Sequence, residues 1–244
     1  MGSGVRPTGI DSAAAALRYW ERREEVVANN LANVSTDGFK GERAFARLLG
    51  DGSTPAIDSA TDFRLGPLTT TGQPFDVAIA HGGFFVVNTA AGEKFTRGGE
   101  LRVDDHHQLV DSRGNPMLGE DDPQGGLRGP VVLPETMKEL QITQGGAVIV
   151  DGKQVARLRV EQVPPGTRLQ HEGAGLFGAP ANRESIAADA RSIRQGVREE
   201  SNVNSVEALV DMIAVQRAYG SVQKALTTID AARGITTNDL GKAL

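Results

Sequence analysis

The sequence predicts a mainly β protein with α-helices at both ends. We expect a central antiparallel β domain, sandwich- or barrel-like, flanked by N- and C-terminal amphipathic helices that pack as a coiled-coil-like stalk. Apolar residues recur at helical spacing near the start of the chain and again near its end, whereas short strand-like runs separated by turn residues lie between them. The chain has 244 residues, which is long enough for one sizeable core with extensions.

Residues 10–35 follow a helical pattern. Positions at steps of three and four are apolar or small, with Glu24 as the one charged interruption; they are Ile10, Ala13, Leu17, Trp20, Val27, Leu31 and Val34. Such a heptad spacing predicts a helix whose apolar stripe packs against another helix. Asp11 is the expected N-cap of this helix, and Gly38 is the expected left-handed residue that terminates it.

The helical period disappears between residues 68 and 180. Short alternating or apolar runs take its place, at 75–80, 84–88, 101–104, 108–111, 131–133, 140–143, 147–150 and 158–163. Short strands with a turn every 8–12 residues or so are typical of antiparallel sandwiches and barrels. Asp151-Gly152, between AVIV and KQVARLRV, predicts a β-hairpin.

Residues 199–244 are helical in pattern again. The stripe advances by three and four from residue 205 to residue 240, and a second apolar flank widens it near its start, at Val206, Leu209, Val210 and Ile213. A helix of about 35 residues would be about 50 Å long. The terminal stripes could cover each other within one chain, or they could also dock on other copies, and their length favours the second alternative.

These patterns divide the chain into five segments. We expect an N-terminal polymerisation helix and turn at 1–45, a linker at 46–67 and the central β domain at 68–185. A second linker at 186–200 then leads to a C-terminal polymerisation helix at 201–244. In the free monomer the terminal helices should be poorly ordered, leaving a protease-resistant core near residues 68–185.

Composition excludes several classes of function. The net charge is −5 and no basic tract occurs, which argues against a nucleic-acid partner. The absence of cysteine excludes disulfides, a thiolate nucleophile and a cysteine-based metal site. No apolar run approaches the length of about 18 residues that a transmembrane helix needs. The first residues also lack the apolar core of a cleavable signal peptide, so we expect neither a cleaved signal peptide nor membrane insertion.

The candidate catalytic and ligand-binding motifs have ordinary structural explanations. Gly82-Gly83 resembles an oxyanion loop, but no G-x-S-x-G pentapeptide accompanies it, so a turn is expected. His106 and His107 are adjacent, and successive strand residues face opposite ways, so a turn is favoured over a metal site. GAGLFG at 173–178 follows a loop and precedes Ala179-Pro180, which is the wrong context for a dinucleotide site.

Carboxylates are numerous but show no sign of catalytic tuning. Glu120, Asp121, Asp122, Glu199 and Glu200 stand in exposed-looking contexts, with no apolar pocket to shift a pKa. The sequence therefore predicts no catalytic residue, no cofactor and no metal.

Three motifs carry a family resemblance. The stretch ANNLANVSTDGFK at 28–40 resembles the N-terminal signature of bacterial flagellar rod, hook and hook–filament junction proteins. The stretch SNVNSVEALVDMIAVQRAYGSVQKALTTID at 201–230 is similar to the C-terminal domain of that family. Between them, residues 71–119 resemble the core of its rod proteins, so the motifs occur in the family's order and span most of the chain.

The resemblance implies a structural subunit of an axial helical polymer, the basal-body rod that acts as a drive shaft from motor to hook. Family members are exported unfolded by the flagellar type III apparatus, and their terminal helices form an inner tube. The implied partners are copies of the chain itself, neighbouring rod proteins, the export apparatus and the surrounding ring proteins. The implied location is the periplasm-spanning rod of the basal body.

Within the family, the short segment after Phe45 favours the proximal rod protein closest to the distal rod, with the distal rod protein as the alternative. A rival of another class is a secreted cell-wall-binding β protein with a helical stalk. That class needs aromatic platforms or clustered carboxylates in the β domain. The chain has one Trp, at position 20, and two Tyr. A third option, an adaptor of the export apparatus, would remain cytoplasmic.

Three asparagines beside the first stripe, Asn29, Asn30 and Asn33, are predicted to fix register at a subunit seam, because a buried amide needs a matched partner. The alternative is that they cap and solvate one helix face. Lys40 and Arg43 are predicted to pair with acidic residues of an adjacent subunit. The full predicted interface comprises Leu17, Trp20, Val27, Asn29, Asn30, Leu31, Asn33, Phe39, Lys40, Asn202, Met212, Val215, Gln216, Arg217, Tyr219, Leu226 and Ile229.

Overall fold

The structure is a computed structural model that describes residues 9–47, 56–120, 129–164, 166–173 and 175–242. It is mainly β with two long helices and a central region rich in antiparallel strands. The chain divides into two compact units. The first contains α1 (Gly9–Ala32), β1 (Glu42–Arg47), β2 (Ala56–Thr61) and α2 (Ser205–Lys242), and the second contains residues 33–41 and 63–203.

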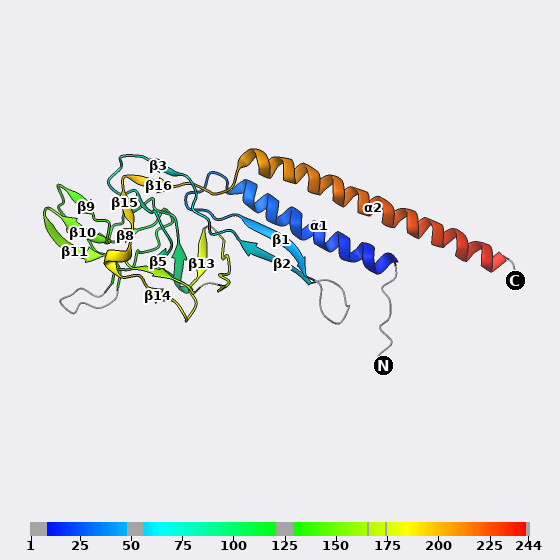
Figure 1. The fold of residues 1–244 in the computed structure, drawn as a ribbon, viewed down its shortest axis with the longest axis horizontal. Helices are drawn as coiled ribbons and strands as arrows, with labels where there is room; N and C mark the ends of the chain where they lie inside the picture. Colours follow the sequence, from blue (N-terminus) through cyan, green and yellow to red (C-terminus); the bar gives the residue numbers. More distant parts are fainter. Residues whose placement is uncertain (1–8, 48–55, 121–128, 165, 174, 243–244) are drawn as a thin grey trace. The chain divides into compact units, whose positions relative to one another are not determined.

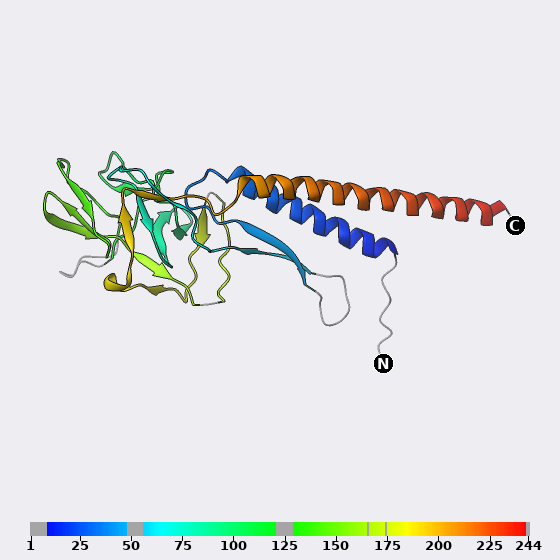
Figure 2. The ribbon, with the colours of Figure 1, turned by 45° about the horizontal axis from the view of Figure 1, so that its top comes forward.

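In the first unit the two helices lie side by side and antiparallel (Figures 1 and 2). The Tyr219 hydroxyl donates a hydrogen bond to Glu21 Oε1 over 3.3 Å, which marks their register. Strands β1 and β2 form an antiparallel ribbon in which Glu42 lies opposite Thr61 and Arg47 opposite Ala56, and β1 packs against α1.

The helix boundaries follow from local chemistry. Asn204 caps α2, because its Oδ1 accepts hydrogen bonds from the backbone N–H groups of Val206 (2.9 Å) and Glu207 (3.2 Å). Helix α1 begins at Gly9, so the prediction of Asp11 as N-cap is wrong and Asp11 lies inside the first turn. Gly38 has the predicted left-handed conformation, with φ +67°, but α1 has already ended at Ala32.

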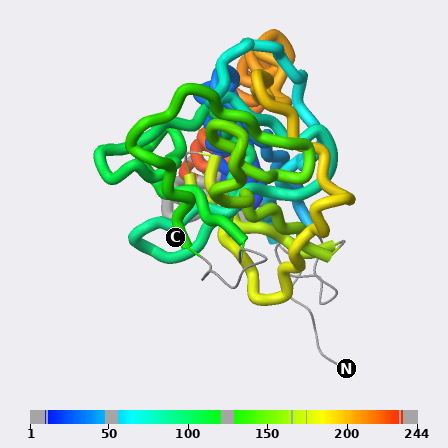
Figure 3. Tube along the Cα trace, turned by 90° about the vertical axis from the view of Figure 1, so that its left-hand side faces the viewer, coloured from blue at the N-terminus to red at the C-terminus, as the bar shows by residue number. Residues whose placement is uncertain are grey.

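The second unit is built from short antiparallel strands, which Figure 3 shows from the side on which β9, β10 and β11 lie. Its largest sheet has five strands in the order β13-β6-β5-β12-β14, and a three-stranded sheet has the order β11-β10-β9. The remaining strands form the pairs β15-β4, β16-β3 and β7-β8. Among the described residues no sheet closes into a barrel.

The strands of the second unit have these bounds: β3 Leu68–Thr70, β4 Val77–Ile79, β5 Phe84–Thr89, β6 Gly92–Thr96, β7 Arg102–Val103, β8 Leu109–Val110, β9 Leu140–Ile142, β10 Ala147–Val150, β11 Lys153–Arg157, β12 Val160–Gln162, β13 Leu176–Gly178, β14 Glu184–Ser185, β15 Ile193–Gln195 and β16 Val197–Glu199. A short 3-10 helix occupies Ala188–Ala190.

Two apolar clusters form the core of this unit. The larger cluster is aliphatic apart from Phe85 and gathers side chains from most of the strands. In the smaller cluster the rings of Phe84 and Phe95 stack with their centroids 5.3 Å apart, and Phe177 lies against Phe84 at 5.9 Å. Rings at these separations add favourable contact energy to the burial of apolar surface.

Most predicted strands are present in the structure. The Asp151-Gly152 hairpin is confirmed: both residues have positive φ (48° and 82°), and Val150 pairs with Lys153 across the turn. The run at 131–133 forms isolated bridges only. The stretches predicted as linkers contain strands: β2 lies within 46–67, and β15 and β16 lie within 186–200. The sequence did not predict β2 and β15, because their segments AIDSAT and IRQ lack a clear apolar alternation.

Candidate assembly site

The stripes of the two helices cover each other, as the heptad pattern predicts. Along α2, Ala208 and Val215 are buried, and the stripe positions from Met212 to Ile229 are at least half-buried. Along α1, Val26 and Val27 are buried, and Leu17, Trp20 and Leu31 are half-buried. Packing of the two helices therefore covers one apolar stripe on each helix.

The second apolar flank of α2 stays exposed. It consists of Val206, Leu209, Val210 and Ile213, with 68, 52, 60 and 45% of each residue accessible. Their spacing places all four on one face of the helix, away from the stripe that contacts α1. Exposed apolar patches of this kind mark interaction surfaces. We call these four residues the flank.

Asn30 is already engaged within its own chain. Its Nδ2 donates to the backbone carbonyl of Glu42 (2.8 Å), and its Oδ1 accepts from the backbone N–H of the same residue (2.9 Å). The amide thus mimics a strand neighbour for the first residue of β1. Asn33 accepts a hydrogen bond from the Thr36 hydroxyl at 3.2 Å, within the turn after α1. These contacts support the capping alternative for Asn30 and Asn33.

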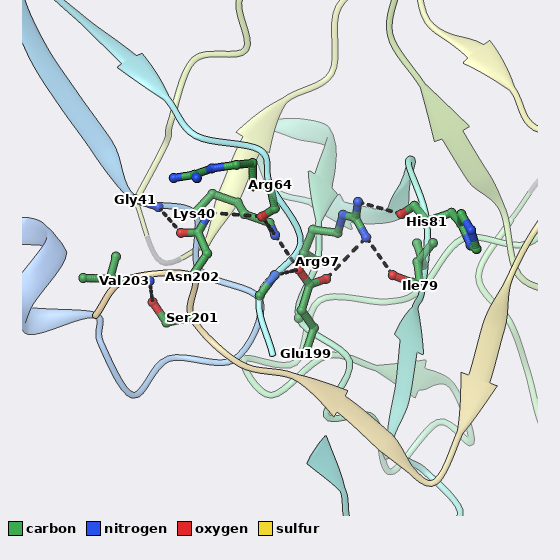
Figure 4. Close-up of polar contacts among 12 residues, drawn as sticks. Lys40, Gly41, Arg64, Ile79, His81, Arg97, Glu199, Ser201, Asn202 and Val203 are labelled. Carbon is green, nitrogen blue, oxygen red and sulfur yellow. Dashed lines mark hydrogen bonds and ion pairs between the residues drawn. The ribbon is translucent and has the colours of Figure 1, made fainter. Parts of the chain in front are cut away.

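In the second unit, the segment after α1 runs beside the segment before α2. Gly38 N–H donates to the Glu199 carbonyl (2.7 Å), and Asn202 N–H donates to the Phe39 carbonyl (3.3 Å). The Asn202 side chain accepts from Gly41 N–H (2.8 Å) and donates to the Arg64 carbonyl (3.0 Å), as Figure 4 shows. The DGFKG and SNV motifs therefore meet, although about 160 residues separate them in the chain.

A buried ion cluster of Lys40, Arg97 and Glu199 lies at this meeting point (Figure 4). The side chains of Lys40 and Glu199 have no accessible surface and form a short ion pair, and Arg97 Nη1 lies 3.3 Å from the second Glu199 oxygen. Gly66 N–H also donates to Glu199 (3.0 Å). One carboxylate thus compensates two buried cations.

Backbone carbonyls also accept hydrogen bonds from the two cations. Lys40 Nζ donates to the Arg64 carbonyl at 2.8 Å, and Arg97 donates to the carbonyls of Ile79 and His81 at 2.9 Å each. Burial lowers the pKa of Arg97, and the nearby Glu199 carboxylate partly offsets that shift. The cluster holds five separate stretches of the second unit in one place.

Glycines allow the backbones around this cluster to approach closely. A Cβ on Gly99 would lie 1.6 Å from the Val77 carbonyl oxygen, and one on Gly66 would lie 2.1 Å from the Glu200 carbonyl oxygen. A Cβ on Gly38 would lie 2.4 Å from the Arg97 carbonyl carbon. No side chain fits at these separations, so the crossing requires glycine.

A second charged group surrounds Arg198. Its guanidinium lies 2.8 Å from Asp37, 3.2 Å from Asp76 and 3.7 Å from Glu100. Burial raises the pKa of Asp37 above its ordinary 3.8, although Arg198 acts in the opposite direction. The three carboxylates in turn raise the pKa of Arg198, against the effect of its burial.

The structure corrects one prediction and restricts another. Glu199 does not stand in an exposed context but is fully buried and ion-paired. Lys40, predicted to meet an adjacent subunit, is fully buried within its own chain, whereas Arg43 is exposed and lies 3.8 Å from Asp62. Gln216 and Arg217 are exposed on α2 and remain available to a partner.

Sequence reasoning missed Arg97, Asn204 and the role of Glu199. The cap had a recognisable signal, since Asn204 followed three residues later by Glu207 is typical of a helix N-terminus. Arg97 had no such signal, because its partner Glu199 is distant in sequence.

Two of the remaining candidate motifs adopt the predicted turns, whereas residues 176–178 of GAGLFG form β13. Gly82-Gly83 connects β4 to β5, with φ +109° at Gly83. The histidine pair forms the turn between β7 and β8, where His107 N–H donates to the Asp104 carbonyl (3.0 Å). Across the described residues, no three His, Cys, Asp or Glu side chains gather as a metal site would require. Neither helix in the described ranges is apolar enough over sufficient length to cross a membrane.

Comparison with known protein families covers both ends and the middle of the chain. Residues 10–40 match the family described as flagella basal body rod protein. Residues 78–150 match the flagellar hook protein FlgE/F/G D1 domain, and residues 194–239 match the flagellar basal body rod FlgEFG protein C-terminal family. These matches define the class: the chain is similar to structural proteins of the flagellar rod and hook.

Similarity to individual proteins identifies the family within this class. The chain is 32% identical over 234 residues to the flagellar basal-body rod protein FlgF of Caulobacter vibrioides, covering 91% of this chain and 93% of that protein. It is 33% identical over 252 residues to FlgF of Salmonella typhimurium, covering 92% and 95%. It is also 30% identical over 263 residues to FlgG of Buchnera aphidicola, covering 93% and 94%. The chain belongs to the flagellar basal-body rod protein family.

Proposed function

We propose that this chain is a structural subunit of the flagellar basal-body rod that self-assembles through its terminal helices. The observation that carries the proposal is the exposed flank of α2 on a helix whose other apolar stripe is already covered by α1. Four large aliphatic side chains in water are a cost that burial against another subunit would remove, at about 25 cal/mol for each Å² covered.

The mechanical role is part of the same proposal. A drive shaft that passes torque from the motor to the hook needs stiff elements and subunits that do not slip. Two packed helices of 24 and 38 residues, about 36 and 57 Å long, provide stiff elements. The predicted interface keeps its members on α1 and α2 other than Asn30. Asn30, Lys40 and Asn202 have partners in their own chain.

We further propose the proximal position closest to the distal rod, with the distal rod protein as the alternative. The proposed partners are copies of the chain, neighbouring rod and hook components, the surrounding ring proteins and, during delivery, the flagellar type III export apparatus. Export without a cleaved signal peptide and a periplasm-spanning location belong to this proposal. Family membership in a group of rod proteins supports it.

The test compares the full chain with a copy that lacks residues 1–32. Retaining residues 33–41 matters, because Phe39 and Lys40 are buried in the second unit. Each form is produced in cells that lack the native protein, and basal bodies are isolated and probed for it. Purified samples are also concentrated and imaged by negative-stain electron microscopy. Circular dichroism and limited proteolysis check that the shortened form keeps its β unit.

The full chain should enter basal bodies and restore motility, whereas the shortened form should do neither while its β unit stays folded. Equal incorporation of both forms would contradict assembly through α1. Specific binding of the full chain to purified murein, combined with its absence from basal bodies, would favour the cell-wall-binding rival.

A further inference from the structure

One segment near the end of the second unit connects many of its parts. Residues 191–202, which we call the strap, contain β15 and β16. Strand β15 pairs with β4, and β16 pairs with β3 (Figure 1). Each of these sheets has two strands among the described residues, so β3 and β4 lose their partner strand wherever the strap is not in place.

Polar side chains of the strap bond to backbone groups that are distant along the chain. Arg191 Nη1 donates to the Leu158 carbonyl over 2.9 Å. Gln195 Nε2 donates to the Pro74 carbonyl (2.7 Å), and Gln195 Oε1 accepts from Ile142 N–H (3.0 Å). The carboxylate of the ion cluster and the amide that meets the DGFKG motif also belong to the strap. The strap therefore joins three sheets and the segment that follows α1.

The contacts of the strap are mainly polar. Across its residues, all of which the structure describes, Ile193 is the only member of either apolar cluster, whereas β5 contributes Phe84, Phe85, Val86 and Val87. Detaching the strap therefore exposes little apolar surface, and hydration of its buried ions offsets part of the attraction that is lost. Segments with few buried apolar contacts are among the least stable parts of a fold.

The strap also makes contacts of very long range. In the ion cluster, 159 residues separate Lys40 from Glu199. Strands β5 and β6 are joined by a tight turn instead, and Thr89 pairs with Gly92 across it. The entropy lost on closing a loop rises with loop length, and non-local contacts form slowly. Local hairpins should therefore form first, and the strap should dock after them.

We infer that the strap is a detachable closing element of the second unit. It docks last when the unit folds and detaches first when the unit opens, while the two apolar clusters stay packed. Its detachment leaves β3 and β4 without a partner strand, and it leaves Lys40 and Arg97 without the carboxylate of Glu199. The unit without its docked strap therefore unfolds more readily than the closed unit.

This inference goes beyond the proposed function, because it concerns how the second unit closes. During synthesis the N-terminal parts of a chain are made first, so residues 63–190 exist before the strap does. The unit cannot reach its closed form until residue 202 has been made. A late closing step suits a chain that is delivered unfolded, and only this use of the strap rests on the proposed function.

Native-state hydrogen exchange of the full chain at low urea concentrations tests the order of opening. Strap probes are amides whose hydrogen bonds join the strap to the rest of the unit, those of Thr71, Ala80, Ile193, Gly196 and Glu200. Core probes are amides that bond away from the strap, those of Asn88, Leu118 and Arg159. Strap probes should exchange about tenfold faster or more, with a weaker dependence on urea, because their opening exposes less surface. Equal rates and equal urea dependence in the two sets would overturn the inference.

Two full-length variants give an independent readout. Val86→Ala, at a fully buried position of β5, should speed exchange of the core probes by about tenfold and leave the strap probes within about twofold, because the strap opens without the core. Gln195→Ala should speed both sets, because the core opens only after the strap has detached. Gln141→Ala, at an exposed glutamine of β9, is the matched control and should change neither set.

Equal acceleration of both sets by Val86→Ala would show that the strap opens only with the whole unit, and would overturn the inference. The native chain and Val86→Ala decide the question even if Gln195→Ala does not fold. A result against the strap leaves the proposed function intact, because that function is tested by incorporation into basal bodies.

Discussion

Replacing Glu199 with Gln should destabilise the second unit strongly. The substitution keeps the size of the side chain and an oxygen that can accept from Gly66 N–H, but it removes the carboxylate charge that pairs with Lys40 and Arg97. Both cations remain buried, with side-chain accessibilities of 0 and 5%. Loss of one partner from a buried ion pair costs about 3–5 kcal/mol.

Urea denaturation of the full chain would measure this loss. At a slope of about 3 kcal/mol per molar urea, the midpoint should fall by about 1–1.7 M. Far-UV circular dichroism is the suitable signal, because the single tryptophan, Trp20, lies in α1 and reports on the first unit. Hydrogen exchange of the Gly38 and Gly66 amides would show that the change is located at the cluster.

The neighbouring residue provides a matched control. Glu200 is exposed and accepts a hydrogen bond from the Thr69 hydroxyl (2.6 Å), so Glu200→Gln should cost less than about 1 kcal/mol. The double variant Lys40→Met with Glu199→Gln should recover part of the loss, because one buried cation is removed as well. A loss below about 1 kcal/mol for Glu199→Gln would refute the reasoning, since the cluster would then not depend on its carboxylate.

Three further predictions concern other positions. Gly99→Ala should destabilise the protein by about 3 kcal/mol or more, because the new Cβ would meet the Val77 carbonyl. Gly82→Ala is the control and should be nearly neutral, because open space surrounds that position. Thermal denaturation would compare the two variants. Burial raises the pKa of Asp37. The protonated form of Asp37 therefore stabilises the fold below the ordinary pKa of 3.8, and this stability is lost as the pH rises through the raised pKa. Asp37→Asn should remove this pH dependence from urea midpoints measured across the acid range. Asn30→Ala leaves the backbone N–H and C=O of Glu42, in β1, without their amide partner. This loss should cost about 1–3 kcal/mol and speed hydrogen exchange in β1. Unchanged exchange would contradict the role of the Asn30 amide as a partner of β1.

Much of the fold can be predicted from local patterns in the sequence. The heptad spacing identified both helices and an apolar stripe on each, because helical periodicity depends only on neighbours three and four residues apart. The Asp151-Gly152 hairpin was predictable for the same reason, as two residues with positive φ favour Asp and Gly. The resemblance of residues 28–40 and 201–230 to rod and hook proteins also rested on the sequence alone, and the family matches confirm it.

Other features were decided only by tertiary structure. Whether Glu199 and Lys40 are exposed or buried depends on five stretches that converge in space, and no local pattern reports their meeting. Strands such as β2 and β15 owe their existence to partners rather than to propensity. Periodicity alone predicted an apolar stripe on α2 with a second apolar flank near its start, because amphipathicity is a local property. Only the structure decided that α1 covers one of them and leaves the flank exposed, because the choice between two faces depends on where a distant helix packs.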